Sequence, residues 1–269
     1  MKISIIGCGW LGFPLALHLL QKGYSVKGSS TQAAKIPVLE AAGIEAHLLQ
    51  LQPAPEGNLS ALLEADALIC NIPPQSQQKG MDFHPAQITH MAAAVAQSPV
   101  KQVIYISSTS VYRDTGGLVR EEDAHKMQNA HPALIAAEEH WLALPQVRST
   151  VLRCGGLMGK ERIAGKYFAG KQVSNADVPV NLVHQADVVR IIEMLLERQE
   201  GGEVYNVVAP EHPSRRALYT ANAEQFGFAP PIFEVPSEAS AAFKVVSSAK
   251  LQKALGYHFL YPNPLYFWD

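Results

Sequence analysis

A doubly wound α/β fold with a parallel central sheet is predicted by three observations. Aliphatic runs alternate with longer amphipathic segments over the first 158 residues, as in parallel strands joined by helices. The first run, residues 2–6, passes directly into Gly7, Gly9 and Gly12. The chain has 269 residues, of which 48% are hydrophobic, enough to bury a large core. Together these observations predict a Rossmann-type domain over residues 1–158 and a small C-terminal, substrate-side region over residues 159–269, partly interleaved with the sheet edge.

Each element is expected from its local pattern. Short runs rich in Val, Ile and Leu predict strands at residues 2–6, 23–27, 44–49, 67–71, 103–107, 150–153 and 204–208. Apolar residues at helical spacing predict helices after Gly12 and at residues 32–42, 85–97, 133–144 and 188–197. Asp187 is expected to cap the last of these helices. Beyond Gly159 the alternation weakens, and prolines and aromatic residues predict a β-like C-terminal region.

The glycine turn predicts a dinucleotide site. Gly7 permits a tight turn, Gly9 lets backbone N–H groups approach a pyrophosphate, and Gly12 lets the next helix lie close to the strand. The helix N-terminus then supplies positive potential without Lys or Arg. The alternative is a glycine turn that binds nothing. The expected cofactor contacts in this turn are Gly7, Gly9, Trp10, Leu11 and Gly12.

The end of the second strand favours NADP over NAD. NAD sites usually carry Asp or Glu there to accept from the ribose 2′-hydroxyl, and this carboxylate would repel a 2′-phosphate. This chain has Ser29, Ser30 and Thr31, whose hydroxyls can donate to phosphate, with Lys27 and Lys35 nearby in the sequence. Serines also cap helices for structural reasons, so NAD stays the alternative. Ile72 and Pro73, which follow the fourth strand, are expected to flank the adenosine.

Composition narrows the class of protein. A formal net charge of -2 argues against nucleic acid as a partner. The three cysteines, Cys8, Cys70 and Cys154, have neither metal-ligand nor disulfide spacing, which predicts no metal and a reducing cytoplasm. No stretch is long enough to cross a bilayer, and the first apolar run lacks the features of a signal peptide. We therefore expect a small-molecule substrate, no membrane partner, and compatibility with a homodimer.

Five motifs in order resemble a known family. They are the glycine turn and residues 106–112, 152–157, 180–187 and 205–208, with sequences ISSTSVY, LRCGGL, VNLVHQAD and YNVV after the turn. The chain resembles extended short-chain dehydrogenase/reductases of the NAD-dependent epimerase/dehydratase kind, and more narrowly the YeeZ-like bacterial group. The resemblance implies that Ser108 hydrogen-bonds a substrate oxygen beside the nicotinamide. It also implies that Ser107 lies at the cofactor, although a strand-end hydrogen bond is an equally simple role.

One departure concerns the proton donor. Active members of that family carry Tyr-x-x-x-Lys on the helix after strand five, whereas this chain has Ala130 and Leu134 at those positions. His131 and His184 are the candidate replacements, although His131 also reads as an exposed residue at a helix start. Arg153 and Arg162 are candidates for binding an anionic substrate. Residues 138–140, Glu-Glu-His, are expected to form a solvated helix face.

Two functional classes remain open on this basis. The first is an NADP-dependent oxidoreductase, epimerase or dehydratase that acts on a small polar substrate such as a nucleotide sugar. The second is a non-catalytic dinucleotide-binding sensor, which the missing Tyr/Lys pair favours. A dehydrogenase with an all-helical C-terminal domain shares the glycine pattern, but the β-like C-terminal half argues against it.

Overall fold

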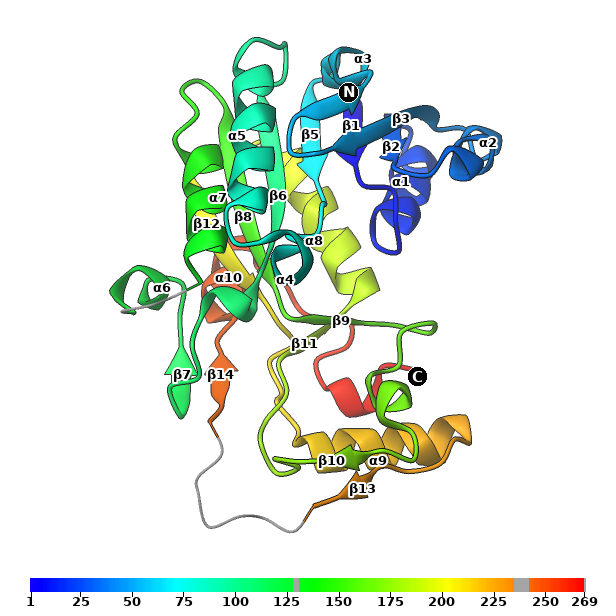
Figure 1. The fold of residues 1–269 in the computed structure, drawn as a ribbon, viewed down its shortest axis with the longest axis vertical. Helices are drawn as coiled ribbons and strands as arrows, with labels where there is room; N and C mark the ends of the chain where they lie inside the picture. The colour runs from blue at the N-terminus through cyan, green and yellow to red at the C-terminus, as the bar shows by residue number, and fades with distance from the viewer. Residues whose placement is uncertain (128–130, 235–241, 269) are drawn as a thin grey trace. The chain divides into compact units, whose positions relative to one another are not determined.

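The computed structural model describes residues 1–127, 131–234 and 242–268 (Figure 1). Two compact units share the chain. The first contains Met1–Val111, Asn129–Arg153 and Val189–Tyr205, and the second contains Tyr112–Gln128, Cys154–Val188 and Asn206–Asp269. The segments of the two units therefore alternate along the chain. The chain first enters the second unit at Tyr112, and its last segment in the first unit is Val189–Tyr205.

An eight-stranded sheet forms the centre of the first unit. The predicted doubly wound α/β fold is confirmed. Its spatial order is β12-β8-β6-β5-β1-β2-β3-β4, so the order reverses between β1 and β5. Pairs β1–β2, β1–β5, β2–β3 and β5–β6 are parallel, and β4 pairs antiparallel with β3. Ligands of such sheets bind beyond the carboxyl ends of the strands at the reversal point. The strands are β1 (Lys2–Ile6), β2 (Ser25–Ser30), β3 (Glu45–Leu51), β4 (Pro55–Gly57), β5 (Ala67–Cys70), β6 (Gln102–Ser108), β8 (Arg148–Cys154) and β12 (Glu203–Val207).

Helices cover both faces of this sheet. They are α1 (Gly12–Gln21), η1 (Ala33–Lys35), α2 (Ile36–Ala41), α3 (Leu59–Leu63), α4 (Ser76–Lys79), α5 (Phe83–Ala96), η2 (Thr109–Val111), α7 (Pro132–Leu142) and α8 (Gln185–Arg198). The helix expected over residues 32–42 is divided into η1 and α2, because Pro37 has no N–H to continue a hydrogen-bonded ladder. A hydrogen bond of 2.7 Å between His18 and Glu193 joins α1 to α8.

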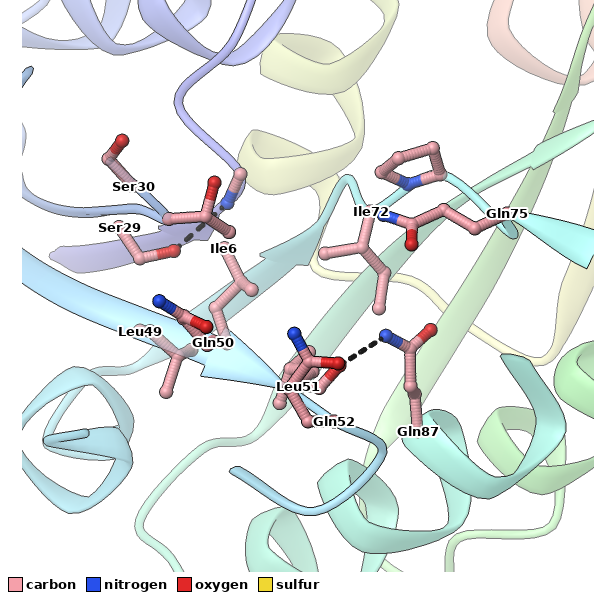
Figure 2. Close-up of a pocket in the computed structure, with 13 residues that line it drawn as sticks. Ile6, Ser29, Ser30, Leu49, Gln50, Leu51, Gln52, Ile72, Gln75 and Gln87 are labelled. Atoms are coloured by element: carbon pink, nitrogen blue, oxygen red, sulfur yellow. Dashed lines mark hydrogen bonds between the residues drawn. The ribbon is translucent and has the colours of Figure 1, made fainter. Parts of the chain in front are cut away.

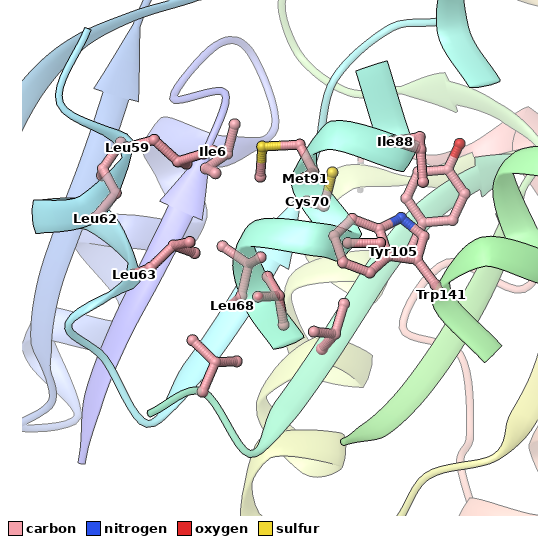
Figure 3. Close-up of a cluster of buried hydrophobic side chains, with 14 of the residues drawn as sticks. Ile6, Leu59, Leu62, Leu63, Leu68, Cys70, Ile88, Met91, Tyr105 and Trp141 are labelled. Atoms are coloured by element: carbon pink, nitrogen blue, oxygen red, sulfur yellow. The ribbon is translucent and has the colours of Figure 1, made fainter. Parts of the chain in front are cut away.

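The core on the other face lies under α3, α5 and α7 (Figure 3). Leu62, Leu68, Met91, Val103 and Trp141 are all 0% exposed and belong to one apolar cluster. Each fully buried side chain of this size contributes about 1.5–3 kcal/mol to folding. The cluster holds the helices firmly against the strands whose ends carry the candidate site.

The second unit is built from short parallel strand pairs and several helices. The pairs are β7 (Gly117–Val119) with β14 (Lys244–Val246), β9 (Gly156–Met158) with β11 (Leu182–His184), and β10 (Gln172–Val173) with β13 (Ile232–Phe233). The helices are α6 (Asp123–Lys126), η3 (Ala164–Phe168), α9 (Arg215–Phe226), α10 (Ala249–Leu255) and η4 (Pro264–Tyr266). The expectation of a β-like C-terminal region is therefore only partly right, because α9 is a helix of 12 residues.

The helix α9 was not expected, although the sequence carries signals at both of its ends. Ser214 caps α9 by accepting from the Ala217 N–H at 3.1 Å, and Gly227 ends it with a φ of 68°.

The expectation that Asp187 caps a helix is wrong. Asp187 is not the cap of α8, which begins at Gln185. Its fully buried carboxylate instead accepts from the Tyr257 hydroxyl and the Leu260 N–H, both at 2.7 Å, and so anchors the C-terminal segment.

Candidate functional site

The turn between β1 and α1 needs glycine at two positions. Gly7 has a φ of 101°, and a Cβ built on it would collide with the Asn71 carbonyl oxygen. A Cβ on Gly12 would collide with the Gly7 carbonyl oxygen, so glycine here lets α1 lie close to the turn. Asn71 fixes the arrangement by donating from its side-chain amide to the Gly7 carbonyl at 3.0 Å. Gly9 differs from both, because a Cβ there meets nothing within 4 Å.

A pocket of about 260 Å³ lies at the carboxyl ends of β1, β2 and β3 (Figure 2). The loop after β5 and the helix α5 complete its wall. It is smaller than the roughly 300–1,000 Å³ of pockets that enclose a drug-sized ligand, so it suits one part of an extended ligand. The lining residues are Ile6, Gly7, Ser29, Ser30, Thr31, Leu49, Gln50, Leu51, Gln52, Ile72, Pro73, Gln75 and Gln87.

Six of the expected cofactor residues line this pocket together: Gly7, Ser29, Ser30, Thr31, Ile72 and Pro73. The lining does not include Gly9, Trp10, Leu11 or Gly12, which belong to the turn and the start of α1. The two serine hydroxyls hold the backbone. Ser29 accepts from the Gly7 N–H and Ser30 accepts from the Gln32 N–H, each at 3.1 Å. A hydroxyl that accepts one hydrogen bond still has its own proton to donate.

Four glutamines in the wall were missed from the sequence: Gln50, Gln52, Gln75 and Gln87. No charged side chain is among the lining residues. Amides offer both donors and acceptors, which suits a neutral heteroaromatic ring more than an anion. The signal that could have found Gln50 and Gln52 is their place at and just after the carboxyl end of β3, the edge of a parallel sheet where ligands bind.

These residues fit a dinucleotide. The two glycines that a Cβ would block keep the backbone turn tight, and the pocket beside it has apolar walls with neutral polar groups. The lining contains no Asp or Glu at the end of β2, where an NAD-selective carboxylate would stand. When bound, a nicotinamide dinucleotide supplies hydride transfer, and the protein supplies its binding and orientation.

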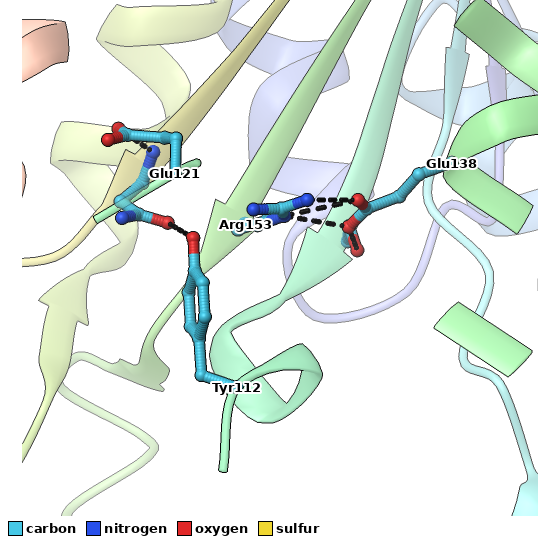
Figure 4. A network of polar contacts seen from close by, with 6 residues as sticks. Tyr112, Glu121, Glu138 and Arg153 are labelled. Atoms are coloured by element: carbon cyan, nitrogen blue, oxygen red, sulfur yellow. Dashed lines mark hydrogen bonds and ion pairs between the residues drawn. The ribbon is translucent and has the colours of Figure 1, made fainter. Parts of the chain in front are cut away.

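Ser107 does not face the pocket. Its hydroxyl, on a residue 6% exposed, donates to Glu138 Oε1 at 2.6 Å. Arg153, which is 0% exposed, donates to both Glu138 oxygens, with Nη2 to Oε2 at 2.6 Å (Figure 4). The expected solvated face is therefore wrong for Glu138, which is 1% exposed. Arg153, a candidate for binding an anionic substrate, is instead buried in this ion pair.

Ser108 and His131, two of the expected catalytic residues, both lie in the first unit. Ser108 ends β6 half-buried, and its hydroxyl donates to Ser110 Oγ at 3.0 Å. His131 precedes α7 and donates its backbone N–H to the Val111 carbonyl at 3.0 Å. Its buried Nδ1 has no hydrogen-bond partner among the described residues. Ala130 lies outside the described residues, and Leu134, at the position of the family lysine, is buried at 2% exposure.

His184, the third expected catalytic residue, lies in an aromatic cluster of the second unit. Its ring centroid is 3.9 Å from that of Tyr261, and its Nδ1 accepts from the Ala186 N–H at 3.1 Å. Burial, with a smaller contribution from Lys160, lowers the pKa of His184 to about 4. A histidine with this pKa is neutral at pH 7, so it is a poor proton donor near neutrality.

The second unit has a hollow of its own, of about 510 Å³. Arg162 supplies a cation at its wall, and Tyr167, Phe168 and Tyr219 supply aromatic surface. Phe168 stacks on Tyr219 with ring centroids 5.0 Å apart, while Tyr167 is 60% exposed. Aromatic faces together with an arginine suit a planar ring that carries an anionic group.

The three cysteines are buried thiols. All three are free and buried, and burial raises the pKa of Cys8, Cys70 and Cys154 to about 12 each, far above a reactive thiolate. Among residues 1–127, 131–234 and 242–268, no cluster of three His, Cys, Asp or Glu side chains has metal-binding geometry. The same residues contain no helix with the length and apolar character needed to cross a membrane.

Comparison with known proteins agrees with this geometry. Residues 7–199 match the model of a family described as NAD(P)H-binding. The chain belongs to the NAD(P)H-binding family. It is also 34% identical over 268 residues to Protein YeeZ of Escherichia coli strain K12, which covers 98% of this chain and 97% of the relative. The predicted membership of the YeeZ-like group is therefore confirmed.

Solved structures share the fold of this family. MoeE5 in complex with UDP-glucuronic acid and NAD is 18% identical, with a TM-score of 0.80 over 96% of this chain and 94% of that chain. UDP-N-acetylglucosamine 4-epimerase from Bacillus cereus is 13% identical, with a TM-score of 0.80 over 98% of this chain and 96% of that chain. At these identities the likeness establishes a common fold of the epimerase and short-chain dehydrogenase type.

Proposed function

We propose that this protein is a cytoplasmic NADP-dependent oxidoreductase, epimerase or dehydratase that acts on a small polar substrate, with a nucleotide sugar as the first candidate. The observation that carries the proposal is the pocket at the ends of β1, β2 and β3, where the glycine turn, two serines and four glutamines converge. Free, buried cysteines are consistent with a reducing compartment.

The preference for NADP rests on the end of β2. Ser30 accepts from the Gln32 N–H, so its own proton is available for a 2′-phosphate oxygen, and Thr31 adds a second hydroxyl. Lys35, at the end of η1, adds positive charge shortly after in the chain. A carboxylate, which would repel the phosphate, is absent from the lining residues.

The nucleotide-sugar assignment is supported by the hollow of the second unit. A nucleotide sugar combines a planar base with a diphosphate, and the hollow offers aromatic side chains with Arg162. Guanidinium groups bind phosphate oxygens through paired hydrogen bonds. One structural relative, MoeE5, was solved both with UDP-glucuronic acid and with UDP-glucose.

For catalysis we assign Ser108 to the reacting oxygen and His131 to proton transfer. Ser108 lies at the carboxyl end of β6, and its hydroxyl bonds the hydroxyl and the backbone N–H of Ser110. His131 brings an unpartnered Nδ1 at the start of α7, one residue after the position of the family tyrosine. His184, neutral and packed against the Tyr261 ring, is left out of this assignment.

The second candidate function is a dinucleotide-binding sensor without catalysis. Leu134, in the position of the family lysine, is buried, so the side chain that lowers the tyrosine pKa in active members is replaced by a core residue. A sensor would bind NADP(H) with a difference between the oxidised and reduced forms, and would leave all substrates unchanged.

Ser30→Asp is expected to reverse the cofactor preference. The new carboxylate repels a 2′-phosphate, since like charges about 4 Å apart interact by about 4 kcal/mol at an effective dielectric of 20. It can also accept from a ribose 2′-hydroxyl. We expect NADP⁺ to bind about tenfold or more weakly and NAD⁺ to bind more tightly in calorimetric titration. Ser25→Asp, at the exposed opposite end of β2, is the matched control. Equal or tighter binding of NAD⁺ by the unmodified protein contradicts the preference.

Ser108→Ala tests the reaction assignment. Absorbance of NADPH and mass detection over a library of UDP-sugars and small alcohols identify the substrate first. The variant is then expected to lower kcat by about 10²-fold with unchanged NADP affinity, as when one donor to a developing oxyanion is removed. Ser25→Ala should leave kcat unchanged. Turnover that ignores Ser108 refutes the assignment, whereas tight and redox-selective NADP binding without any turnover supports the sensor.

A further inference from the structure

A chain of four hydrogen-bonded groups runs from the apolar core to the wall of the cofactor pocket. Tyr105 Oη lies 2.6 Å from His84 Nε2, and His84 Nδ1 lies 3.1 Å from Gln87 Oε1. Gln87 Nε2 then donates to the Leu51 carbonyl at 2.9 Å, as Figure 2 shows. Tyr105 belongs to β6, His84 and Gln87 to α5, and Leu51 to the end of β3.

The hydrogen-bonding partners fix which of these four groups donate and which accept. The Leu51 carbonyl only accepts, so Gln87 must present its NH₂ to it and turn Oε1 toward His84. His84 Nδ1 must then carry the proton, which leaves Nε2 as the acceptor for the Tyr105 hydroxyl. Burial lowers the pKa of His84, against an opposing effect of the Gln87 hydrogen bond, and so favours this neutral form. Flipping the His84 ring or the Gln87 amide therefore breaks two hydrogen bonds.

One end of this hydrogen-bonded series lines the pocket, and the other end is buried in the core. Gln87 and Leu51 line the pocket, whereas His84 and Tyr105 do not. His84 is 0% exposed and Tyr105 is 1% exposed, and Tyr105 packs in the apolar cluster with Trp141 (Figure 3). Unpaired polar groups at this depth are costly, so burial favours the paired arrangement of His84 and Tyr105. The enforced amide orientation ties α5 to the Gln50–Leu51–Gln52 wall at the end of β3.

We propose that Tyr105 and His84 are positioning residues for the dinucleotide, which act by fixing the Gln87 amide and, through the Leu51 carbonyl, the glutamine-rich wall of the pocket. The proposal rests on the proposed cofactor function and deepens it. Two side chains that do not line the pocket then contribute to its specificity for the dinucleotide. The pocket wall is preorganised for an uncharged heteroaromatic ring that has both donor and acceptor edges.

Tyr105→Phe is the principal test, because it removes one oxygen and keeps the aromatic ring beside His84 and Trp141. His84 Nε2 then loses the hydroxyl that donates to it, so the Nδ1–H form of the ring is less strongly favoured. We expect the affinity for NADP⁺ to fall about three- to tenfold, the scale of one net hydrogen bond. ADP-ribose 2′-phosphate should lose the same factor, and nicotinamide mononucleotide should lose none. The ¹⁵N spectrum of the His84 ring, single for the Nδ1–H form in the unmodified protein, should no longer report one tautomer.

Ile88→Val is the matched control for stability. Ile88 follows Gln87 on α5, is 0% exposed in the same cluster and carries no polar group, so the variant loosens the core and leaves the hydrogen-bonded chain intact. Its NADP⁺ affinity should equal that of the unmodified protein. Gln87→Met removes the link between core and wall, so adding Tyr105→Phe to it should produce no further loss of affinity.

The outcomes separate the two levels of the proposal. An unmodified protein that binds neither NADP⁺ nor NAD⁺ overturns the proposed function itself. Tight binding by the unmodified protein, with Tyr105→Phe indistinguishable from Ile88→Val, overturns the positioning role alone. Additive losses of NADP⁺ affinity in the Tyr105→Phe, Gln87→Met double variant also overturn it. If Tyr105 acts only through Gln87, its substitution has no further effect once Gln87 is replaced.

Discussion

Glu138→Gln is expected to lower the free energy of unfolding by about 3–5 kcal/mol, the range for breaking a buried ion pair on one side. Arg153 is 0% exposed and donates to both oxygens of Glu138. Glutamine keeps the shape but not the charge, so the guanidinium stays buried without its counter-charge. Urea unfolding followed by circular dichroism measures the change as a shift in the midpoint at constant slope.

Two further variants make the result specific. Glu139→Gln, the same substitution at the next residue, lies on the exposed side of α7 and should change stability by only about 0.5 kcal/mol. Glu138→Gln combined with Arg153→Met removes both charges, and should be more stable than Glu138→Gln alone. A loss for Glu138→Gln no larger than that for Glu139→Gln would mean that the pair is not the buried anchor described above.

Gly9→Val is expected to abolish dinucleotide binding while the fold survives. Gly9 has no positive φ, and its added Cβ meets nothing within 4 Å, so valine is tolerated by the protein itself. The same open space is where a pyrophosphate needs to approach the backbone N–H groups. Fluorescence titration should find no NADP⁺ or NAD⁺ binding, and circular dichroism should be unchanged.

The control for this variant is Gly117→Val in β7. An added Cβ there also meets nothing within 4 Å, and Gly117 also lacks a positive φ. It should therefore fold and bind as the unmodified protein does. Undiminished affinity of Gly9→Val would show that the phosphates bind elsewhere than on the glycine turn. A different substitution, Gly12→Val, is unsuitable because its Cβ would collide with the Gly7 carbonyl oxygen.

The order of the elements followed closely from the sequence because its signals are local. Runs of β-branched residues predicted β1, β5 and β6 within a residue or two of their observed bounds, and the glycine spacing located the turn into α1. The expected absence of a carboxylate at the end of β2 holds for the pocket lining. The C-terminal half was read less well, since α9 was overlooked despite Ser214 and Gly227 at its two ends.

The sequence by itself determined the alternation of strands and helices, the tight glycine turn, and the missing tyrosine and lysine, because each depends on residues a few positions apart. Only the tertiary structure decided which polar groups are buried. Glu138 reads as a solvated residue until Arg153, 15 positions away, lies against it. Gln87 reads as an ordinary helix residue until Leu51, 36 positions away, accepts its hydrogen bond. Such pairings depend on how the strands order themselves across the sheet, and burial makes them obligatory once that order is set.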